Sequence, residues 1–461
     1  MILVYGLGLL AFERIRSSSS KRPEAQNEKA TGLQYVLAGR RLTLFPFIAT
    51  MVATAYGWVL GVGELYARFG ISAWLFLSLP YSLATLFFAL FMARKARSMG
   101  FITLTDLLQR FYGRKVANFG TLLFLVLCSP AMYLLMGAQV VDYAGGLDIG
   151  FGLLLVTGFS VLYLFGSGFE AVVRTDTLQF GWMYFGFGLL LAATAWQQGH
   201  APLARLPHNL TQWSLNYSPA YLLSWLLLAG YNLIDPNFYQ RIYALESAHT
   251  ARRGLLIAVG FWTLFDFLAA TTALYALGLG FAESEPAYLY LRLAQSQLPA
   301  PLAAFVMVGV MAAILSTVDS FVFYSGVALG RDLLRANGYL KGRPMSSVVR
   351  WAVAVTALAA LALAFAYRRQ TAVDLFLEWH PLAVSALLWP VLGAYVPAVR
   401  LSARMTLVQM VAAGAATAVY QVLKSDLTAI YPALKPVESV VVGAGTALIL
   451  GLAGLVQARL R

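Results

Sequence analysis

The sequence predicts an all-α, polytopic membrane protein, and three observations carry this prediction. Hydrophobic residues make up 60% of the 461 positions and charged residues only 11%, whereas soluble globular domains average about 25% charged residues. The mean hydropathy is +0.71. The apolar residues also form long runs that are nearly free of charge. These features disfavour a water-soluble enzyme, a DNA-binding protein and a disordered chain.

A helix that crosses the ~30 Å hydrocarbon core needs roughly 20 mostly apolar residues. Twelve segments meet this requirement, and we predict one spanning helix in each: 42–66, 71–93, 116–141, 149–169, 175–197, 217–240, 254–280, 301–329, 351–367, 373–398, 405–423 and 438–456. Residues 1–12 are equally apolar but rise only ~18 Å as a helix. Because no small-residue cleavage site follows them, we interpret them as the inner end of a truncated thirteenth helix rather than a signal peptide.

The basic residues orient the predicted helices. The loops alternate between two sides, and one side holds 26 of the 33 Lys and Arg residues, including Arg241 in the loop 241–253. By the positive-inside rule, this side is cytoplasmic, and the C-terminus lies on it. The same asymmetry explains the net charge of +13 without a nucleic acid. We therefore predict an integral protein of the plasma (inner) membrane, with the lipid bilayer as its partner.

Other patterns argue against an enzyme or an ATP-driven pump. The chain has no Walker loop, no HExxH and no GxSxG, which are expected in NTPases, zinc proteases and serine hydrolases. The four histidines lack metal-ligand spacing, and the single cysteine, Cys128, has no internal disulfide partner. The sequence therefore predicts no enzymatic activity, no organic cofactor and no transition metal. It also indicates no obligatory protein partner.

Two predicted spans are poor continuous helices. The first contains three glycines within 57–63, and the sixth contains Gly230 and the pair Asp235-Pro236. Relative to alanine, glycine costs a helix ~1 kcal/mol and proline ~3 kcal/mol. Unwound backbone inside a membrane needs a partner, which a bound ion or substrate can supply. Interrupted helices at matching positions indicate a transporter built from inverted repeats, although glycines also serve close helix packing.

The predicted helix 301–329 carries a polar face. Ala313, Ser316, Thr317 and Ser320 follow helical spacing and share one side. Hydroxyls on a membrane helix often bond to their own backbone. The neighbouring Asp319, however, is an acid at membrane depth, which indicates a functional site. Hydroxyls and freed carbonyls beside an acid supply the oxygens that a hard cation requires.

Further acidic and polar residues lie at or near membrane depth. Asp176 is one turn into its span, Asp266 is in the middle of 254–280, and Glu378 and His380 are near the outer part of 373–398. Asp266 and Glu378 are candidates for substrate contacts or for structural partners of buried donors. Two other acids, Glu64 and Asp142, lie close to the outer interface, where solvation explains them equally well.

Five segments resemble motifs of the sodium:solute symporter family, and they occur in the family's order over residues 31–400. They are LQYVLAGRR before the first span, FITLTDLLQRFYGRK in a cytoplasmic loop, GFEAVVRTDTLQ (168–179), NFYQRIYALESAHTARRG (237–254) and AAILSTVDS with ALGRDLL (312–334). One match of this kind is weak, but five in order are strong.

The resemblance implies the leucine-transporter fold, with a core of five plus five helices related as inverted repeats. It predicts a truncated helix and cytoplasmic linker over 1–41, a transport core over 42–398, and two peripheral helices over 399–461. The two repeats of the core would be 42–197 and 217–398.

The resemblance also implies transport driven by a sodium gradient, with sodium bound between core helices 1 and 8. The family's ligands fall on carbonyls near Ala53, Thr54 and Tyr56, on the Ala313 carbonyl, and on the hydroxyls of Ser316 and Thr317. Sodium would be co-transported.

Some family members have a second sodium site around the acid of the TD motif. The resemblance therefore predicts a second cation site formed by Asp176, Asp319 and Ser320. An aspartate at position 319 fits a sodium ligand, a proton-binding group or a group that tunes the local field, and the sequence leaves these alternatives open.

The substrate residues implied by the resemblance and by the aromatic pattern are Trp58, Tyr133, Tyr231, Asn232, Asp266, Glu378 and His380. Trp379 belongs to the same aromatic set. Sugar-transporting members carry a glutamate on core helix 2 and a lysine on core helix 7, whereas this chain has neither and places Asp266 on helix 7. The set suits a small neutral or cationic solute.

The predicted mechanism is alternating access, in which sodium and a small organic solute bind from outside and are released inside. Proton coupling through Asp176 or Asp319 is the alternative within the same fold. A solute sensor that does not transport is the alternative from another functional class.

Overall fold

The computed structural model describes residue 8 and residues 28–213, 217–281, 285–435 and 437–459. The predicted N-terminal helix 1–12 lies almost entirely outside these residues. Regular structure in the described part is helical, and a single isolated bridge joins Leu42 and Leu245. The predicted all-α class is therefore confirmed for these residues.

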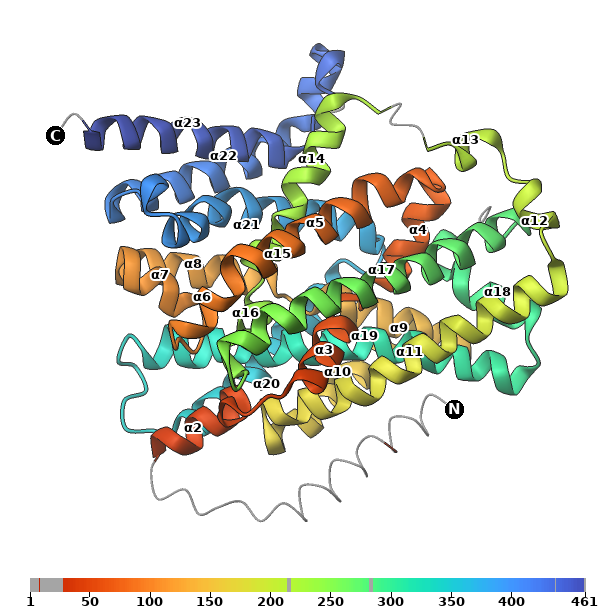
Figure 1. The fold of residues 1–461 in the computed structure, drawn as a ribbon, viewed down its shortest axis with the longest axis horizontal. Coiled ribbons are helices and arrows are strands. Elements are labelled where there is room, and N and C mark those ends of the chain that lie inside the picture. The colour runs from red at the N-terminus through yellow and green to blue at the C-terminus, as the bar shows by residue number, and fades with distance from the viewer. Residues whose placement is uncertain (1–7, 9–27, 214–216, 282–284, 436, 460–461) are drawn as a thin grey trace.

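Most long helices run along the long axis of the molecule (Figure 1). The first half contains α2 (Glu28–Leu37), α3 (Leu44–Ala55), α4 (Val59–Phe69), a continuous helix Trp74–Ser98 that includes α5 (Leu79–Phe87) and α6 (Ala93–Ser98), α7 (Leu104–Tyr112), α8 (Arg114–Leu127), α9 (Ala131–Gly145), α10 (Ile149–Ser167) and α11 (Phe169–Gln198).

The second half begins after two short helices, α12 (Ala201–Ala204) and α13 (His208–Thr211). It contains α14 (Pro219–Ala229), α15 (Tyr231–Ile234), α16 (Pro236–Ala244), α17 (Ala248–Gly278), α18 (Leu289–Gln297), α19 (Ala300–Val327, continued to Arg335), α20 (Met345–Ala366), α21 (Ala372–Tyr395), α22 (Ala403–Ile430) and α23 (Ser439–Arg459).

Nine helices of the described residues are long and apolar enough to cross a membrane, or ten if the bent pair α3–α4 forms one span. Each of the twelve predicted segments falls on helical structure. The segment 217–240 is divided among α14, α15 and α16, and the described apolar part of α10 is short, covering Ile149–Leu162. The count of twelve spans thus stays a prediction.

The predicted interruption of the first span is confirmed. Helix α3 ends at Ala55, α4 begins at Val59, and the chain bends by 53° between them. A Cβ added at Gly57 would overlap the Thr317 side chain of α19, so glycine lets the break approach that helix closely. Gly61, by contrast, lies inside α4 and packs on the Trp58 ring. One of the three glycines thus marks the break, and another serves packing.

The predicted interruption at 217–240 is also confirmed. Helix α14 ends at Ala229, just before Gly230, and Asp235 adopts an extended backbone conformation between α15 and α16. The Asp235 side chain accepts a hydrogen bond from Asn237 N at 2.8 Å, which caps α16, and Pro236 occupies the first helical position. Proline is favoured there because it lacks only an N–H that would have no helical partner. The break is therefore encoded locally.

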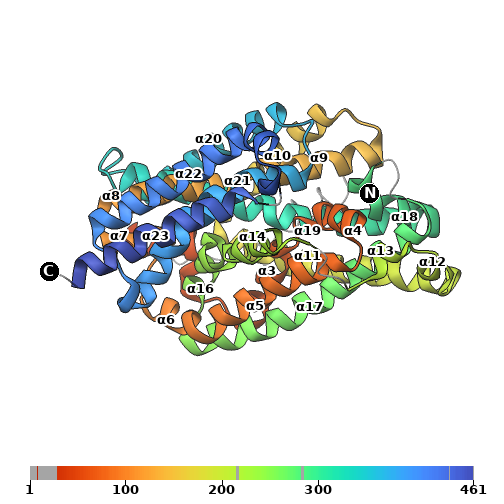
Figure 2. The same cartoon turned by 90° about the horizontal axis from the view of Figure 1, so that it is seen from above.

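Helix α19 lies at the centre of the molecule. It packs against α3, α9, α10, α11, α18 and α20, and every residue from Val306 to Val327 is buried. Figure 2 shows the same bundle turned by 90°, with α19 beside α9 and α11. Helices α22 and α23 pack chiefly on each other and on α21. Polar residues on α19 are therefore positioned by helices from both halves of the chain.

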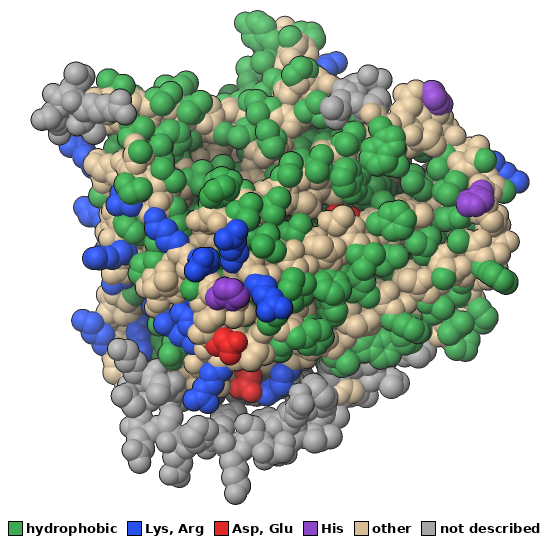
Figure 3. Space-filling view, in the orientation of Figure 1, with side chains coloured by type: hydrophobic (Ala, Val, Ile, Leu, Met, Phe, Trp, Pro, Cys, Tyr) green, Lys and Arg blue, Asp and Glu red, His purple; other side chains and the backbone are tan. Residues whose placement is uncertain are grey.

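The charged side chains are distributed unevenly. On the face shown in Figure 3, most Lys and Arg side chains gather toward the end that carries α2, α6, α7 and α8. This distribution agrees with the predicted orientation. Arg241 is an exception, because it is fully buried in α16. Its assignment to an exposed cytoplasmic loop was therefore wrong, since that assignment rested only on its place after the apolar run.

Candidate functional site

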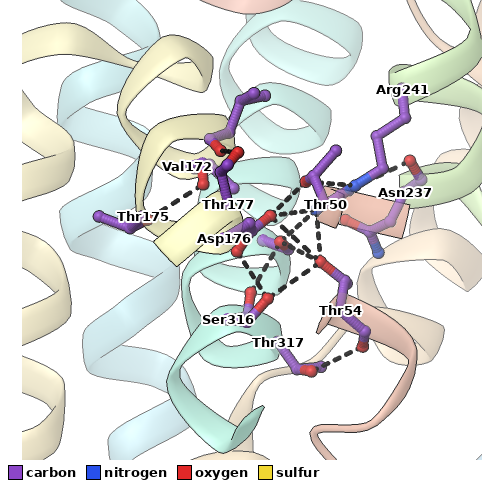
Figure 4. Close-up of polar contacts among 12 residues, drawn as sticks. Thr50, Thr54, Val172, Thr175, Asp176, Thr177, Asn237, Arg241, Ser316 and Thr317 are labelled. Atoms are coloured by element: carbon purple, nitrogen blue, oxygen red, sulfur yellow. Dashed lines mark hydrogen bonds and ion pairs between the residues drawn. The ribbon is translucent and has the colours of Figure 1, made fainter. Parts of the chain in front are cut away.

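Asp176 of α11 lies at the centre of a buried polar cluster formed with α3 and α19 (Figure 4). The Ser316 hydroxyl donates to Asp176 Oδ1 at 2.6 Å. The Thr50 hydroxyl donates to Asp176 Oδ2, and the Thr54 hydroxyl lies 3.4 Å from the same oxygen. Thr50 and Thr54 belong to α3 and Ser316 to α19, so tertiary packing gathers these hydroxyls around the carboxylate of α11.

The cation in this cluster is the Arg241 guanidinium, which enters from α16. Its Nη2 lies 3.1 Å from Asp176 Oδ2 and donates to the Thr54 and Ser320 hydroxyls at 2.6 Å and 2.7 Å. Its Nε donates to the Thr50 hydroxyl at 2.9 Å. Both charged side chains have zero exposure. A buried charge is tolerated when it is paired and hydrogen-bonded, and this pair meets both conditions.

The residues predicted to bind sodium meet where α3 ends beside α19. The Thr317 hydroxyl donates to the Thr54 carbonyl at 2.7 Å and lies 3.5 Å from the Ala313 carbonyl. At the end of α3, the Tyr56 amide donates to the Ala53 carbonyl at 3.3 Å. A helix end leaves carbonyls without helical partners, and these are ligands of the kind that sodium accepts. The structure thus brings Thr54, Ala313, Ser316 and Thr317 together. The Tyr56 carbonyl accepts from the Val59 amide at 3.1 Å, and Ser316 is hydrogen-bonded to Asp176.

The residues predicted to form a second cation site are not all together. Ser320 reaches the Arg241–Asp176 pair, with its hydroxyl 3.2 Å from that of Thr54. Asp319 does not contact the cluster. It is fully buried on another side of α19, where its carboxyl group faces Ser160 of α10.

A cavity of about 130 Å³ lies between the two broken helices. Its wall comes from both breaks, from the helix Trp74–Ser98, and from α9, α17, α19 and α21. The lining residues that carry polar groups or aromatic rings are Thr54, Tyr56, Trp58, Ser78, Tyr81, Ser82, Tyr133, Tyr231, Asn232, Asp235, Phe238, Trp262, Asp266, Phe321, Phe376 and His380. None of the lining residues in the described part of the chain is Lys or Arg.

The two cavity carboxylates are held by neutral groups. Asp266 Oδ1 lies 2.7 Å from the Tyr56 hydroxyl, which is also 2.7 Å from the Trp262 carbonyl. Asp235 accepts hydrogen bonds from the backbone and side-chain nitrogens of Asn237, at 2.8 Å and 3.2 Å. Neither carboxylate forms an ion pair within the described residues. The described cavity wall therefore supplies no ion-pair partner for these two acids, and Arg241 acts on Asp235 only at longer range.

Several polar atoms of the wall have no hydrogen-bond partner within the described protein: the Tyr81 hydroxyl, Trp262 Nε1 and His380 Nε2. His380 Nδ1 lies 3.2 Å from the Phe376 carbonyl. Because a carbonyl only accepts, Nδ1 carries the proton and Nε2 is left as an acceptor. Buried polar atoms are normally paired, so these three favour a bound solute or water.

Six of the seven predicted substrate residues line the cavity: Trp58, Tyr133, Tyr231, Asn232, Asp266 and His380. Asn232 also connects α15 with α5 by hydrogen bonds, since its amide donates to the Tyr81 carbonyl at 3.1 Å and to the Thr85 hydroxyl at 2.9 Å. Glu378 is exposed and lies outside the wall, with its carbonyl accepting from Gln421. Trp379 packs on Tyr367 instead of lining the cavity.

Several site residues were not predicted from the sequence. Asp235 was read only as part of a helix break, and Arg241 as a loop charge. Tyr81, Trp262 and Phe376 were not distinguished from ordinary membrane aromatics. Asp235 lies at the second break, and Arg241 follows it by six residues inside the short helix α16 that begins there. This spacing is the sequence feature from which the two residues could have been predicted as part of the site.

The model of the sodium:solute symporter family matches residues 35–400. The chain belongs to this family. The match begins before α3 and ends after α21, so it includes both broken helices and the polar face of α19. The family resemblance of the five sequence motifs is thereby confirmed.

Related proteins and structures agree with this membership. The "High-affinity choline transporter 1" of Caenorhabditis elegans is 26% identical over 54% of this chain and 44% of its own length. A "Sodium/proline symporter" of Staphylococcus aureus is 25% identical over 73% of this chain and 71% of its own length. The chain spans less than half the length of the two choline transporters that it matches.

Solved structures show the fold. A Na+-coupled sialic acid symporter in a substrate-bound outward-open state superposes with a TM-score of 0.79, at 14% identity, over 100% of this chain and 97% of that one. A nucleobase-cation-symport-1 family transporter in a closed conformation gives a TM-score of 0.59, at 14% identity, over 92% and 94%. The predicted leucine-transporter-like fold is confirmed.

Proposed function

We propose that this protein is a sodium-coupled symporter of the plasma membrane that imports a small organic cation by alternating access. The observation that carries the proposal is the cavity between the two broken helices, which contains two carboxylates and no basic side chain among its described lining residues. A cationic group would supply the missing positive charge. Aromatic rings favour the same ligand, because their faces attract cations.

The size of the cavity narrows the substrate class. A cavity of about 130 Å³ is slightly smaller than the roughly 150 Å³ cavity that holds one benzene molecule in another protein. A solute of about six to eight heavy atoms fits this space, whereas a hexose is too large without expansion. The polar atoms of Tyr81, Trp262 and His380 would then bind a hydroxyl or carbonyl of the solute.

The relatives suggest two candidate solutes, choline and proline. Choline carries one positive charge and one hydroxyl, which match the carboxylates and the unpaired His380 Nε2. Proline adds a carboxylate, for which the described cavity wall offers no arginine or lysine. A like charge beside Asp266 or Asp235 would be unfavourable in a buried site. We therefore infer that the substrate is a choline-like amine rather than an amino acid.

Sodium would bind beside the cavity, where α3 ends against α19. Its ligands in this proposal are the carbonyls near Ala53, Thr54 and Tyr56, the Ala313 carbonyl and the hydroxyls of Ser316 and Thr317. Thr54 and Tyr56 also line the cavity, so sodium and solute would order the same backbone segment. Shared ordering makes each ligand raise the affinity for the other, as coupling requires.

The test is uptake of radiolabelled choline into proteoliposomes that contain the purified full-length chain. We expect accumulation with an inward sodium gradient and not with potassium or N-methylglucamine at equal ionic strength. An inside-negative potential should increase uptake, because each charge gains ~2.3 kcal/mol per 100 mV. Proline and glucose serve as solute controls.

Three results would contradict parts of the proposal. Uptake driven by a pH gradient without sodium would replace sodium coupling with proton coupling. Sodium-driven uptake of proline but not choline would overturn the cationic substrate. Choline binding without uptake in either gradient would support a sensor.

A further inference from the structure

We propose that the guanidinium of Arg241 is a built-in cation that fills the second cation site of this protein, so that this site takes no sodium. The consequence for transport rests on the proposed sodium coupling. If that proposal holds, only the site between α3 and α19 carries sodium in each transport cycle. The observation behind it is the arrangement of oxygen atoms around Arg241 (Figure 4).

The oxygens that surround the guanidinium are those expected of a sodium site. They are Asp176 Oδ2 and the hydroxyls of Thr50, Thr54 and Ser320, at 2.6 to 3.1 Å from the guanidinium nitrogens. Carboxylate and hydroxyl oxygens are also the ligands that hard cations prefer. The guanidinium therefore uses the donor set that a sodium ion would need.

The charge of the cluster is already balanced. Asp176 and Arg241 are both fully buried and form an ion pair. Glu170 and Arg174 of the same helix α11 pair with each other instead. A sodium ion added beside the guanidinium would bring two positive charges together in a low-dielectric interior, which is strongly unfavourable.

Arg241 is also held firmly at this position. Its Nη1 lies 3.3 Å from the Asn237 carbonyl one turn earlier in α16, and the Phe169 ring lies under the guanidinium at 5.7 Å. Since α16 itself is fixed by the Asp235 cap, the side chain is anchored at both ends. A resident group of this kind is not released during a transport cycle, whereas a bound sodium ion would be.

The Arg241 side chain also connects the helices at both breaks with α19. Arg241 belongs to the helix after the second break, Thr50 and Thr54 to the helix before the first break, and Ser320 to α19. In a site with bound sodium, these elements would separate when the ion leaves. Here they stay connected, so we expect sodium release from the site near Thr317 to leave this cluster intact.

The experiment counts bound sodium in the purified full-length protein by equilibrium binding of radioactive sodium. We compare the wild type with Arg241→Gln, which removes the positive charge but keeps a polar amide, and with Arg241→Lys, which keeps the charge. We expect Arg241→Gln to bind one sodium ion more per protein than the wild type, and Arg241→Lys to bind the same number as the wild type. In the double variant Arg241→Gln/Asp176→Asn the extra ion should be lost, because the carboxylate is gone.

The difference between variant and wild type tests this inference, whereas the wild-type count tests the proposed function. A wild type that binds no sodium, together with an Arg241→Gln variant that gains one ion, would support the built-in cation and overturn sodium coupling. A folded Arg241→Gln protein that gains no ion would overturn the built-in cation.

A milder variant covers the case in which Arg241→Gln does not fold. Ser320→Ala removes one hydroxyl that contacts Arg241 and should leave the number of bound sodium ions and the sodium affinity unchanged. The matched control is Ser316→Ala, at a predicted sodium ligand one turn away, which should weaken sodium binding. Loss of one bound sodium ion in Ser320→Ala would overturn the inference.

Discussion

The two buried acidic regions of this protein differ in how their charge is balanced. Asp176 is paired with Arg241 and surrounded by hydroxyls. Asp266 and Asp235 line the central cavity, and within the described residues they accept hydrogen bonds from neutral groups. The acid of the first region has its cationic partner within the protein, whereas the proposed function assigns a cation from outside to the second region. The comparison shows that an acid at membrane depth does not by itself identify a transported ion.

The largest effect is expected from breaking the balanced region. Asp176→Asn removes the only carboxylate that pairs with Arg241 in the described residues. A buried charge that has lost its partner lowers the free energy of unfolding by about 3–5 kcal/mol. We therefore expect a much lower melting temperature in detergent, measured by intrinsic tryptophan fluorescence. Asp176→Asn/Arg241→Met should recover part of this loss, because neither charge of this pair is then left without its partner.

The control for this prediction is Glu378→Gln, which neutralises an exposed carboxylate outside the site. It should melt like the wild type. If Asp176→Asn melted equally high, the ion pair would contribute little, and the comparison of the two regions would fail.

In the cavity, we expect a change in substrate affinity instead of stability. Asp266→Asn removes the carboxylate that faces Tyr56. Truncating one member of a buried charge pair costs about 2–5 kcal/mol of binding, or at least a roughly 30-fold weaker affinity. The measurement is the choline concentration that gives half-maximal uptake. Glu378→Gln again serves as the control, and an equal loss in both variants would remove Asp266 from the substrate site.

A smaller effect is expected at the contact that joins the two regions. Gly57→Ala places a Cβ against the Thr317 side chain, and overpacking of this kind costs about 1–3 kcal/mol. We expect a lower melting temperature and weaker activation of uptake by sodium. In Gly188→Ala, no atom of another residue lies within 4 Å of the added Cβ, and both quantities should stay at wild-type values. Unchanged sodium activation in Gly57→Ala would show that α3 and α19 need not approach so closely.

The smallest effect is expected from Thr317→Val, which keeps the side-chain shape and removes the hydroxyl. One hydrogen bond contributes about 0.5–1.5 kcal/mol, so sodium activation should weaken about 2–10-fold. The matched control is Thr194→Val on α11, whose hydroxyl bonds only to the Leu190 carbonyl of its own helix. A response to potassium equal to that to sodium, in either variant or the wild type, would contradict a specific sodium site.

Much of the site follows from local sequence signals. The glycine at 57 and the pair Asp235-Pro236 predicted both helix breaks, because they change backbone preferences where they stand. The hydroxyl face of α19 followed from helical spacing alone. Glu378, in contrast, shares the same helix and nearly the same depth as His380, yet only His380 lines the cavity. Spacing cannot decide that difference, since it depends on which neighbour each side of α21 meets.

The sequence by itself determined the helical membrane architecture, because apolar runs in a bilayer must satisfy their own backbone hydrogen bonds. Its ordered motifs also determined the family. Only the tertiary structure decided where the charges act. Arg241 follows an apolar segment and has the local sequence of a loop residue, but α16 carries it into the interior beside Asp176, which lies 65 positions away in the chain. Electrostatic pairing depends on distance in space, and no local pattern records that distance.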